Sequence, residues 1–567
     1  MQTKLPCLEK DSISQQLVVD GETFLMRPAE LQNSSLSSAK FMKDVWPKLV
    51  EGNINTVLGS VAWEQIEPRE GEFCFEELDQ ILKDARSHSL RLVLLWFGSF
   101  KNGVSTYVPG WVKTNARRFP RAKINDTASP GAPRVTEVLS IFHNESVAAD
   151  ARAFGKLMEH LRDVDKDHST VIMVQVENEV GLLGDSRDRS TLANKTFASP
   201  VPSDLMNLLD VQSEKLPEAL RRHLKLWHSL RSPENKSWEV VFGPSQQTDE
   251  LFMAYHYAKY LEQVASAGKS AYPIPLYTNV WQNYAGEDVD NSSDIPVVVG
   301  GGGQPGDYPS GGAVSHVLDV WRALAPSLDF IAPDIYLNDY KAVCSHYSRQ
   351  NDQPLFIPEQ RRDDYGARRI WAAYGSFQAI GAAPFGIDTL TPEESPFTKH
   401  FGLLGKVSRQ VLAAQRSPGS MVGFFFDEFS TPDPSPPVVT TMGDWELTIE
   451  RAFVFGKPSP GFGLVIHTGP ASFLLVGEGF HVRFKSLLKD ACFTGILSFT
   501  EQEVVDEKTG EMQTVRVLNG DETRSGLLAI MPAKSPDYGS FPICVTIPAG
   551  TRIAKCEVYA LRDGDDL

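Results

Sequence analysis

The sequence has 567 residues, of which 42% are hydrophobic and 22% are charged. That composition is typical of a globular protein and excludes disorder as the main state of the chain. Its 55 basic and 72 acidic residues leave a net charge of −17, which repels nucleic acid and anionic membrane surfaces. The length exceeds that of one ordinary hydrophobic core, so we expect at least two domains.

The cellular location is predicted from what the sequence lacks. No stretch approaches the ~20 consecutive apolar residues that a membrane span needs, and the start, MQTKLPCLEKDSISQQ, has no apolar signal core. We therefore expect a cytoplasmic protein. Export is the alternative, because six Asn-x-Ser/Thr glycosylation motifs occur, at Asn33, Asn125, Asn144, Asn194, Asn235 and Asn291. The six cysteines have no metal or redox spacing and are predicted to be free thiols.

From Phe24 onward, short apolar runs alternate with stretches of helical period such as 75–90, 147–164 and 251–269. Eight runs are predicted strands: 24–31, 55–63, 90–98, 171–179, 274–281, 329–336, 354–360 and 379–388. Strands that alternate with helices predict an α/β fold, a (β/α)8 TIM barrel over residues 1–415. The polar, proline-containing stretch around 185–245 is predicted to be an insertion after the fourth strand.

The pattern changes beyond residue 415. The segment STPDPSPP (430–437) is dense in proline, and short alternating apolar runs separated by glycine and proline follow it. Regular short strands without helices between them predict a smaller β-sandwich domain over residues 416–567.

Acidic residues end two of the predicted barrel strands. The run VIMVQVENEVG (171–181) places Glu177, Asn178 and Glu179 at the end of the fourth strand, and Glu359 ends the seventh. Barrel active sites lie at the carboxyl ends of the strands. Retaining glycosidases need two carboxyl groups about 5 to 5.5 Å apart, one to protonate the leaving oxygen and one to attack the sugar carbon. Glu177 and Glu179 share strand parity, so both remain candidates for the acid.

The motif QVENEVG resembles the acid/base signature QVENEYG of the family 35 β-galactosidases, with Val180 in place of the aromatic residue. The segment VAWEQIEPREGEFCFEELDQIL (61–82) also resembles their second-strand region and that of the related family 42. The similarity extends from about residue 16 to 415, and a small C-terminal β domain fits a subgroup of the family. The resemblance implies a retaining, exo-acting β-galactosidase that binds carbohydrate and works by double displacement.

The resemblance also implies roles for single residues. Glu179 matches the general acid/base, Glu359 the nucleophile, and Asn178 the residue that binds the sugar 2-hydroxyl. Tyr336, at the end of the sixth strand, is expected to donate a hydrogen bond to Glu359 and keep it ionised. Glu177 is then expected in a buried hydrogen-bond network at the barrel rim.

Residues at other strand ends are further candidates for substrate binding. Three of them are polar, with a loop or helix-cap role as the alternative: Glu30, Glu64 and Asn102. Four tryptophans are candidates for a flat wall against a sugar ring, about half of them expected in the core instead: Trp63, Trp96, Trp111 and Trp281.

The run GGGQPG (301–306) matches the glycine pattern of a dinucleotide site, but Pro305 and Pro309 delay any helix to about Val314, so we expect a loop. No histidine, cysteine or carboxylate spacing indicates a metal or another cofactor. The alternatives are a β-glycosidase of another sugar specificity, a catalytically silent carbohydrate-binding barrel, and an oxidoreductase that uses the glycine run. The sequence carries no signal of an oligomeric state.

Overall fold

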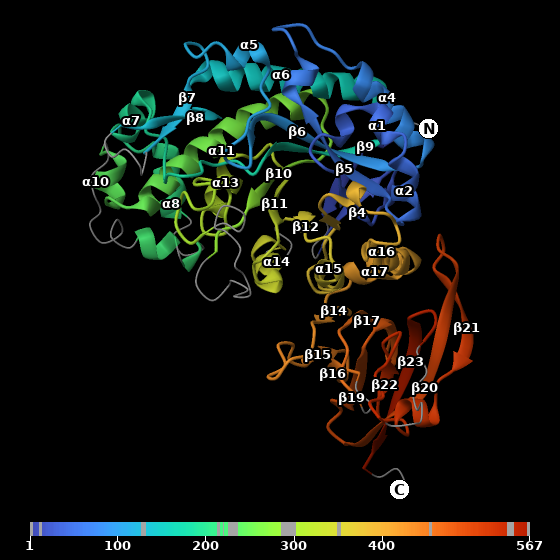
Figure 1. Cartoon of the computed structure of the whole chain (residues 1–567). Helices are drawn as coiled ribbons and strands as arrows, with labels where there is room; N and C mark the ends of the chain where they lie inside the picture. Colours follow the sequence, from blue (N-terminus) through green and yellow to red (C-terminus); the bar gives the residue numbers. More distant parts are fainter. Residues whose placement is uncertain are drawn as a thin grey trace.

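The computed structural model describes residues 4–10, 14–125, 132–211, 216–218, 220–224, 236–284, 302–348, 353–452, 456–540 and 549–563. Figure 1 shows a large body, coloured blue to yellow, and a smaller orange and red body built from strands. A small antiparallel sheet of β1 (Cys7–Lys10), β2 (Gln15–Val19) and β3 (Glu22–Thr23) precedes the strands of the large body. Of the cysteines, five are described as free thiols and Cys544 lies outside the described residues.

The large body is a parallel barrel. Its strands are β4 (Pro28–Glu30), β5 (Thr56–Ala62), β6 (Arg91–Lys101), β9 (Val171–Asn178), β10 (Leu276–Trp281), β11 (Phe330–Asp334), β12 (Phe356–Gln360) and β13 (Gly381–Pro384). The strands from β4 to β11 form one parallel sheet, and β12 pairs with β13. Parallel bridges from Ile335 to Gln360 and from Glu30 to Phe385 join the two sheets into a ring. The predicted TIM barrel is therefore confirmed.

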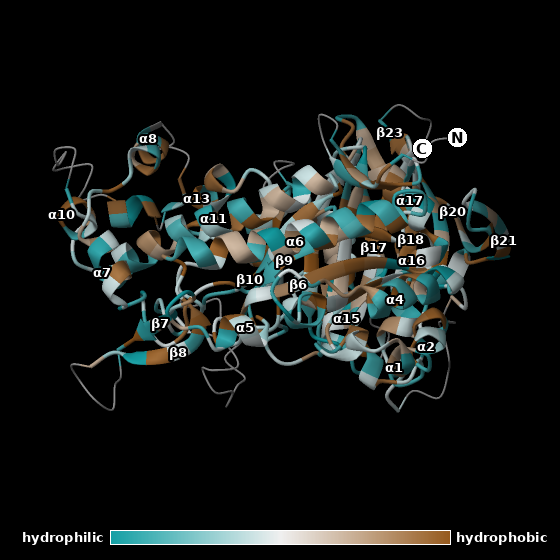
Figure 2. Ribbon diagram, turned by 90° about the horizontal axis from the view of Figure 1, so that it is seen from above, coloured by the Kyte–Doolittle hydropathy of each residue, from teal (hydrophilic) through white to brown (hydrophobic). Residues whose placement is uncertain are grey.

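Helices cover the outside of the ring. The principal ones are α4 (Glu76–Ser87), α6 (Asn144–Asp165), α11 (Gln246–Ala271), α13 (Leu318–Leu324), α14 (Tyr340–Ser348), α15 (Asp364–Ser376), α16 (Phe397–Lys406) and α17 (Ser408–Gln415). In Figure 2, β6 is hydrophobic, whereas α6 beside it carries many hydrophilic residues. None of the described helices has the length and apolar character that crossing a membrane requires.

Shorter elements lie between the barrel strands and these helices. They are α1 (Ala39–Met42), α2 (Trp46–Glu51), α3 (Trp63–Ile66), α5 (Gly110–Lys113), and the hairpin of β7 (Arg121–Ile124) and β8 (Arg134–Leu139). The segment predicted as an insertion holds the short helices α7 (Thr191–Phe197), α8 (Ser203–Val211) and α10 (Trp238–Phe242). The rest of that segment lies partly outside the described residues.

An apolar layer fills the interior of the ring. Tyr277 of β10 stacks on Phe330 with ring centroids 5.1 Å apart, and it meets Phe356 edge-on at 5.4 Å. All three side chains are buried. Asn279 lies two residues beyond Tyr277 and therefore shares its side of the strand. The polar groups at the carboxyl ends of the strands thus lie over an apolar floor.

The C-terminal body consists of two antiparallel sheets that share one apolar core. The first sheet has the order β14 (Met421–Phe426), β17 (Gly461–Gly469), β18 (Ser472–Glu478), β23 (Ile553–Arg562), β20 (Ala491–Asp506) and β21 (Glu511–Val517). The second has the order β15 (Val438–Met442), β16 (Trp445–Arg451), β19 (Phe480–Ser486) and β22 (Ala529–Met531). Side chains from both sheets, including Phe424 and Phe480, pack in the common core. The predicted β-sandwich is therefore confirmed.

The two bodies meet where β14 packs against α15. A side-chain Cβ at Gly423 would lie only 1.9 Å from the carbonyl oxygen of Trp371, so the two backbones approach as closely as glycine allows. Arg369 also forms an ion pair with Asp427 at 2.8 Å across this contact.

We expect the substitution Gly423→Ala to lower the free energy of unfolding by about 1–3 kcal/mol, because the added methyl group overpacks a contact made of backbone. Denaturant titration followed by tryptophan fluorescence measures the change. Gly110→Ala is the control, since a Cβ there meets no atom within 4 Å. Equal stability of the two variants would contradict the close packing of β14 on α15.

Candidate active site

The carboxyl ends of β9 and β12 bring the two predicted glutamates together. Glu179 directly follows β9, and Glu359 lies within β12. Three carboxylate oxygens, one each from Glu179, Glu359 and Asp334, all lie within 4.8 Å of one another. The exposed fractions of Glu179 and Glu359 are only 7% and 5%. This spacing is close to that which a retaining glycosidase needs.

Backbone conformation separates Glu179 from Glu177. Both residues have positive φ angles, 43° and 60°, which side chains other than glycine rarely adopt and which interrupt the alternation of the strand. Glu177 accepts hydrogen bonds from the backbone N–H groups of Ser99 (3.0 Å) and Phe100 (2.8 Å). Gly98 makes room for that carboxyl group, because a Cβ there would lie 2.5 Å from Glu177 Oε1. Glu177 therefore lies in the expected buried network, whereas the carboxyl group of Glu179 lies beside that of Glu359.

Three hydrogen-bond donors surround the carboxylate of Glu359. The Tyr336 hydroxyl donates to its Oε2 at 2.9 Å, and the Nδ2 atoms of Asn178 and Asn279 lie 3.4 Å from its Oε1. Burial and the negative charge of Glu359 raise the pKa of Tyr336 well above its ordinary value, so its hydroxyl keeps the proton that it donates. Donors placed in this way stabilise a negatively charged carboxylate.

The environment of Glu179 favours the protonated form. Burial, followed by the negative charge of Glu359, raises the pKa of Glu179 to about 7, although the positive charge of Lys101 opposes the rise. Its backbone N–H donates to Asn279 Oδ1 at 2.9 Å, which fixes the residue at the end of the strand. A carboxyl group with a raised pKa, beside a second one that accepts several hydrogen bonds, is the arrangement expected of a general acid and a nucleophile.

Lys101 is a site residue that sequence reasoning missed. The prediction ends the third strand at Gly98, whereas β6 continues to Lys101, whose Nζ donates to Asn178 Oδ1 at 2.9 Å. Burial lowers its pKa, but the charges of the surrounding carboxylates, Glu359 foremost, outweigh this and raise it. Asp334 and Asn279 were missed too. All three lie near the carboxyl end of a strand, which is the signal that could have found them.

Two predicted substrate-binding residues at the rim have buried acceptor atoms that no described residue satisfies. Both carboxylate oxygens of Glu30, the last residue of β4, are buried without a donor. Burial and the charge of Glu359 raise the pKa of Glu30 well above its ordinary value. Asn102 follows β6; its backbone N–H donates to the Asn178 carbonyl at 3.2 Å, and its Oδ1 is buried without a donor. Buried acceptors of this kind suit the hydroxyl groups of a sugar.

Among the predicted tryptophans, only Trp281 keeps a partly exposed side chain at a strand end. It is the last residue of β10 and pairs with Asp334 of β11. Trp111 packs edge-on against Trp63, with ring centroids 5.9 Å apart, and its indole N–H donates to the Glu67 carbonyl at 3.1 Å. Trp111 is therefore part of the packing outside the carboxyl cluster.

Three candidates at the second and third strands take the structural alternative that the sequence left open. Glu64 lies in α3, where it is exposed and forms an ion pair with Lys113 at 3.1 Å. Trp63 is fully buried, and its indole N–H donates to Glu67 at 2.8 Å, so its ring offers no face to a ligand. Trp96 is likewise fully buried and belongs to the core.

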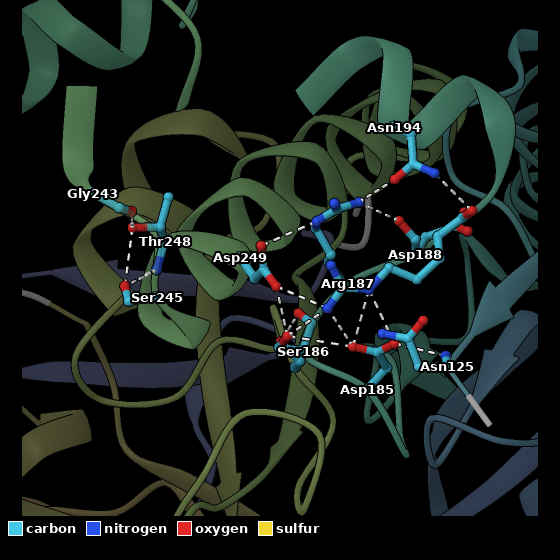
Figure 3. Close-up of polar contacts among 12 residues, drawn as sticks. Asn125, Asp185, Ser186, Arg187, Asp188, Asn194, Gly243, Ser245, Thr248 and Asp249 are labelled. Carbon is cyan, nitrogen blue, oxygen red and sulfur yellow. Dashed lines mark hydrogen bonds and ion pairs between the residues drawn. The ribbon is translucent and has the colours of Figure 1, made fainter. Parts of the chain in front are cut away.

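The loop that follows Glu179 is anchored by a polar network, shown in Figure 3. Arg189 forms ion pairs with Asp185 (2.6 Å) and with Asp249 of α11 (3.0 Å). Asp249 also pairs with Arg187 at 3.0 Å and accepts a hydrogen bond from the Ser186 hydroxyl at 2.7 Å. The chain beyond the acid is thereby tied to a long barrel helix.

A second rim loop, formed by residues 302–312, lies against the first. Leu182 pairs with Ser310 through two backbone hydrogen bonds, and the Gly184 N–H donates to the Gly306 carbonyl at 2.8 Å. The glycine run is thus part of a loop as expected, except for Gly301, which lies outside the described residues, and α13 begins only at Leu318. A helix that could hold a dinucleotide phosphate does not begin in residues 302–312.

Comparison with known families finds two matches, each over part of the chain. Residues 37–295 match the model of glycoside hydrolase family 42, described as "Beta-galactosidase". Residues 397–530 match a domain of unknown function, DUF5597. The expectation of family 35 is not supported, and the matching family is the related one whose second-strand region the sequence also resembles. No curated protein matches the sequence.

Solved structures resemble the chain at low identity. A β-galactosidase from Bacillus circulans sp. alkalophilus is 14% identical with a TM-score of 0.44, over 69% of this chain and 57% of that one. A β-galactosidase from Marinomonas ef1 is 15% identical with a TM-score of 0.44, over 70% and 60%. The catalytic domain of a β-amylase from Paenibacillus polymyxa is 11% identical with a TM-score of 0.44, over 66% and 97%.

This chain thus spans about three fifths of the length of the two β-galactosidases. The family match, which includes β5, β6, β9 and β10, rests on the sequence itself. Residues 37–295 of this chain are therefore similar to the β-galactosidases of glycoside hydrolase family 42.

Proposed function

We propose that the protein is a retaining, exo-acting β-galactosidase. The observation that carries the proposal is the approach of a Glu179 carboxylate oxygen to within 4.8 Å of one from Glu359. An inverting enzyme keeps its two carboxyl groups about 6.5–9.5 Å apart to leave room for a water molecule. The shorter separation supports direct attack by one carboxylate on the sugar.

In the first half of the reaction, Glu359 attacks the anomeric carbon while the bond from that carbon to the leaving oxygen breaks. Glu179 gives its proton to the leaving oxygen, so the aglycone departs as a neutral alcohol. In the second half, Glu179 takes a proton from water, and the water oxygen displaces Glu359 from the anomeric carbon. The two inversions together retain the β configuration.

The remaining polar groups are proposed to hold the sugar. Asn178, oriented by Lys101, binds the 2-hydroxyl, a contact that strengthens as the anomeric carbon gains positive charge. Glu30 and Asn102 accept hydrogen bonds from other hydroxyl groups, and Trp281 packs against the apolar face of the ring. Because the acid pair is buried, the site suits the end of a chain better than its middle, which supports exo action.

Product stereochemistry tests the proposal. Proton NMR of the hydrolysis of 4-nitrophenyl β-galactoside is expected to show the β anomer of galactose first, before mutarotation. A 2-deoxy-2-fluoro-β-galactosyl fluoride is expected to label Glu359, identified by mass spectrometry of the peptides. A first-formed α anomer would contradict the retaining mechanism, and a label on another residue would contradict the assignment of Glu359.

A panel of nitrophenyl β-glycosides tests the sugar preference. The galactoside is expected to have the highest kcat/KM. A higher kcat/KM for another sugar would contradict the galactose preference but not the retaining mechanism. A catalytically silent barrel was the other alternative, in which the acid pair is misplaced. The spacing of Glu179 and Glu359 does not favour it.

The pH dependence of kcat/KM follows from Glu179. The acid must carry a proton to assist the leaving group, and the protonated fraction falls as pH rises through a pKa raised to about 7. We therefore expect kcat/KM to fall about tenfold per pH unit above neutrality. A basic limb that begins below pH 5 would show that burial does not raise the pKa of the acid.

A further inference from the structure

A third carboxyl group, Asp334, lies in the site without a role in double displacement. It ends β11 and is only 2% exposed. Its Oδ2 accepts a hydrogen bond from Asn279 Nδ2 at 2.7 Å. Its Oδ1 is buried without any donor among the described residues. One of its oxygens lies within 4.8 Å of oxygens from both Glu179 and Glu359.

Asn279 fixes the arrangement of these groups. Its amide nitrogen points to Asp334 and its amide oxygen accepts the backbone N–H of Glu179, at 2.9 Å. The amide therefore cannot turn to offer a donor to the second oxygen of Asp334. A buried acceptor without a donor is costly, and it becomes satisfied here if the group carries a proton toward a neighbouring carboxylate.

Titratable side chains from several neighbouring strands surround Asp334. The titratable groups that face it are Glu30, Lys101, Glu179, Tyr277, Tyr336 and Glu359. Lys101 is the cation among them. Burial, with the negative charges of Glu359 and then Glu179 next, raises the pKa of Asp334 well above its ordinary value.

We propose that Asp334 is a positioning residue: a neutral carboxyl group that donates a hydrogen bond to the acid/base Glu179. This rests on the proposed function of Glu179. The donated proton holds the Glu179 side chain in place, and it stabilises the anion that Glu179 becomes after it protonates the leaving group. Neutral carboxylic acids act as donors at neutral pH in other enzymes whose sites raise their pKa.

Two substitutions test the proposal through the pH profile of kcat/KM. Asp334→Asn keeps a neutral donor toward Glu179 and an acceptor for Asn279, so its basic limb should stay within a few tenths of a pH unit of the wild type, with kcat/KM within about threefold. Asp334→Ala removes the donor. Its basic limb should move up by about one pH unit, because ionised Glu179 loses a tenfold stabilisation. Its kcat/KM below the limb should fall at least about tenfold, because the acid is no longer held.

Other results overturn the proposal. A downward shift of the limb by one unit in Asp334→Asn would show that Asp334 is charged. An unshifted limb in Asp334→Ala, with activity lowered equally at all pH values, would show a merely structural role. Asp339→Asn is the matched control, because the exposed Asp339 caps α14 and asparagine caps equally well.

An infrared measurement separates this inference from the proposed function. At neutral pH, the carbonyl band of protonated carboxyl groups should lose intensity in Asp334→Asn but not in Asp339→Asn, whether or not the protein hydrolyses a galactoside. An unchanged band overturns the inference alone. An inactive wild type that shows the expected band loss overturns the β-galactosidase proposal and leaves the neutral state of Asp334 standing.

Discussion

Replacing Glu359 by alanine is expected to lower kcat on aryl β-galactosides by about 10⁴-fold or more, because no other carboxylate among the described residues is placed to attack the anomeric carbon. Asp334 lies close by, yet its side chain is held by Asn279. The binding of galactose should persist, since Asn178, Glu30 and Asn102 remain. Steady-state kinetics with 4-nitrophenyl β-galactoside measures the loss.

The product formed with azide identifies the face of the sugar from which Glu359 attacks. In Glu359→Ala, azide can enter the space left by the side chain and attack an activated β-galactoside from the opposite side to the leaving group. The product should be α-galactosyl azide. The control is Glu64→Ala, an exposed glutamate paired with Lys113, whose kcat should stay within about twofold of the wild type. A β-configured azide product from Glu359→Ala would refute the nucleophile assignment.

Replacing Glu179 by alanine should have an effect that depends on the leaving group. For alkyl β-galactosides, which need protonation, kcat/KM should fall about 10²–10⁴-fold. For a dinitrophenyl galactoside, which leaves without help, kcat/KM should change little. The loss of the base then slows hydrolysis of the galactosyl-enzyme, so this intermediate should accumulate and appear in intact-protein mass spectra.

Azide gives the opposite anomer in this second variant. It attacks the galactosyl-enzyme from the side on which Glu179 stood, and the product should be β-galactosyl azide. Glu177→Gln is the informative comparison: its carboxyl group binds the backbone of Ser99 and Phe100, so its replacement should lower stability without producing dependence on the leaving group. Leaving-group dependence in Glu177→Gln and its absence in Glu179→Ala would exchange the two roles.

The sequence predicts the barrel because eight apolar runs alternate with helical stretches, and the strand ends then locate the acids. What it leaves open is the choice between Glu177 and Glu179. Alternation along a regular strand directs both to one side. The positive φ angles of these residues break that alternation, and such conformations are stabilised by surrounding contacts, not by the residues' own preferences.

The same limit explains the other differences. Lys101 lies beyond the predicted end of its strand, and a lysine in a loop is ordinarily solvated. Burial lowers the pKa of Lys101, and the charges contributed by distant segments, Glu359 foremost, outweigh this effect. Trp63 looks like a rim residue from its position after a strand, yet the helix that begins there turns its ring inward against Trp111.

The contact between α15 and the β-sandwich has a consequence for how the protein folds. Trp371 of α15 stacks on Phe462 of β17, with ring centroids 5.3 Å apart, and both belong to one continuous apolar core. The helix α15 follows β12, the strand that carries Glu359. The C-terminal strands thus cover the outer side of α15, and a barrel expressed without them would expose apolar side chains of this helix close to the strand that carries the nucleophile.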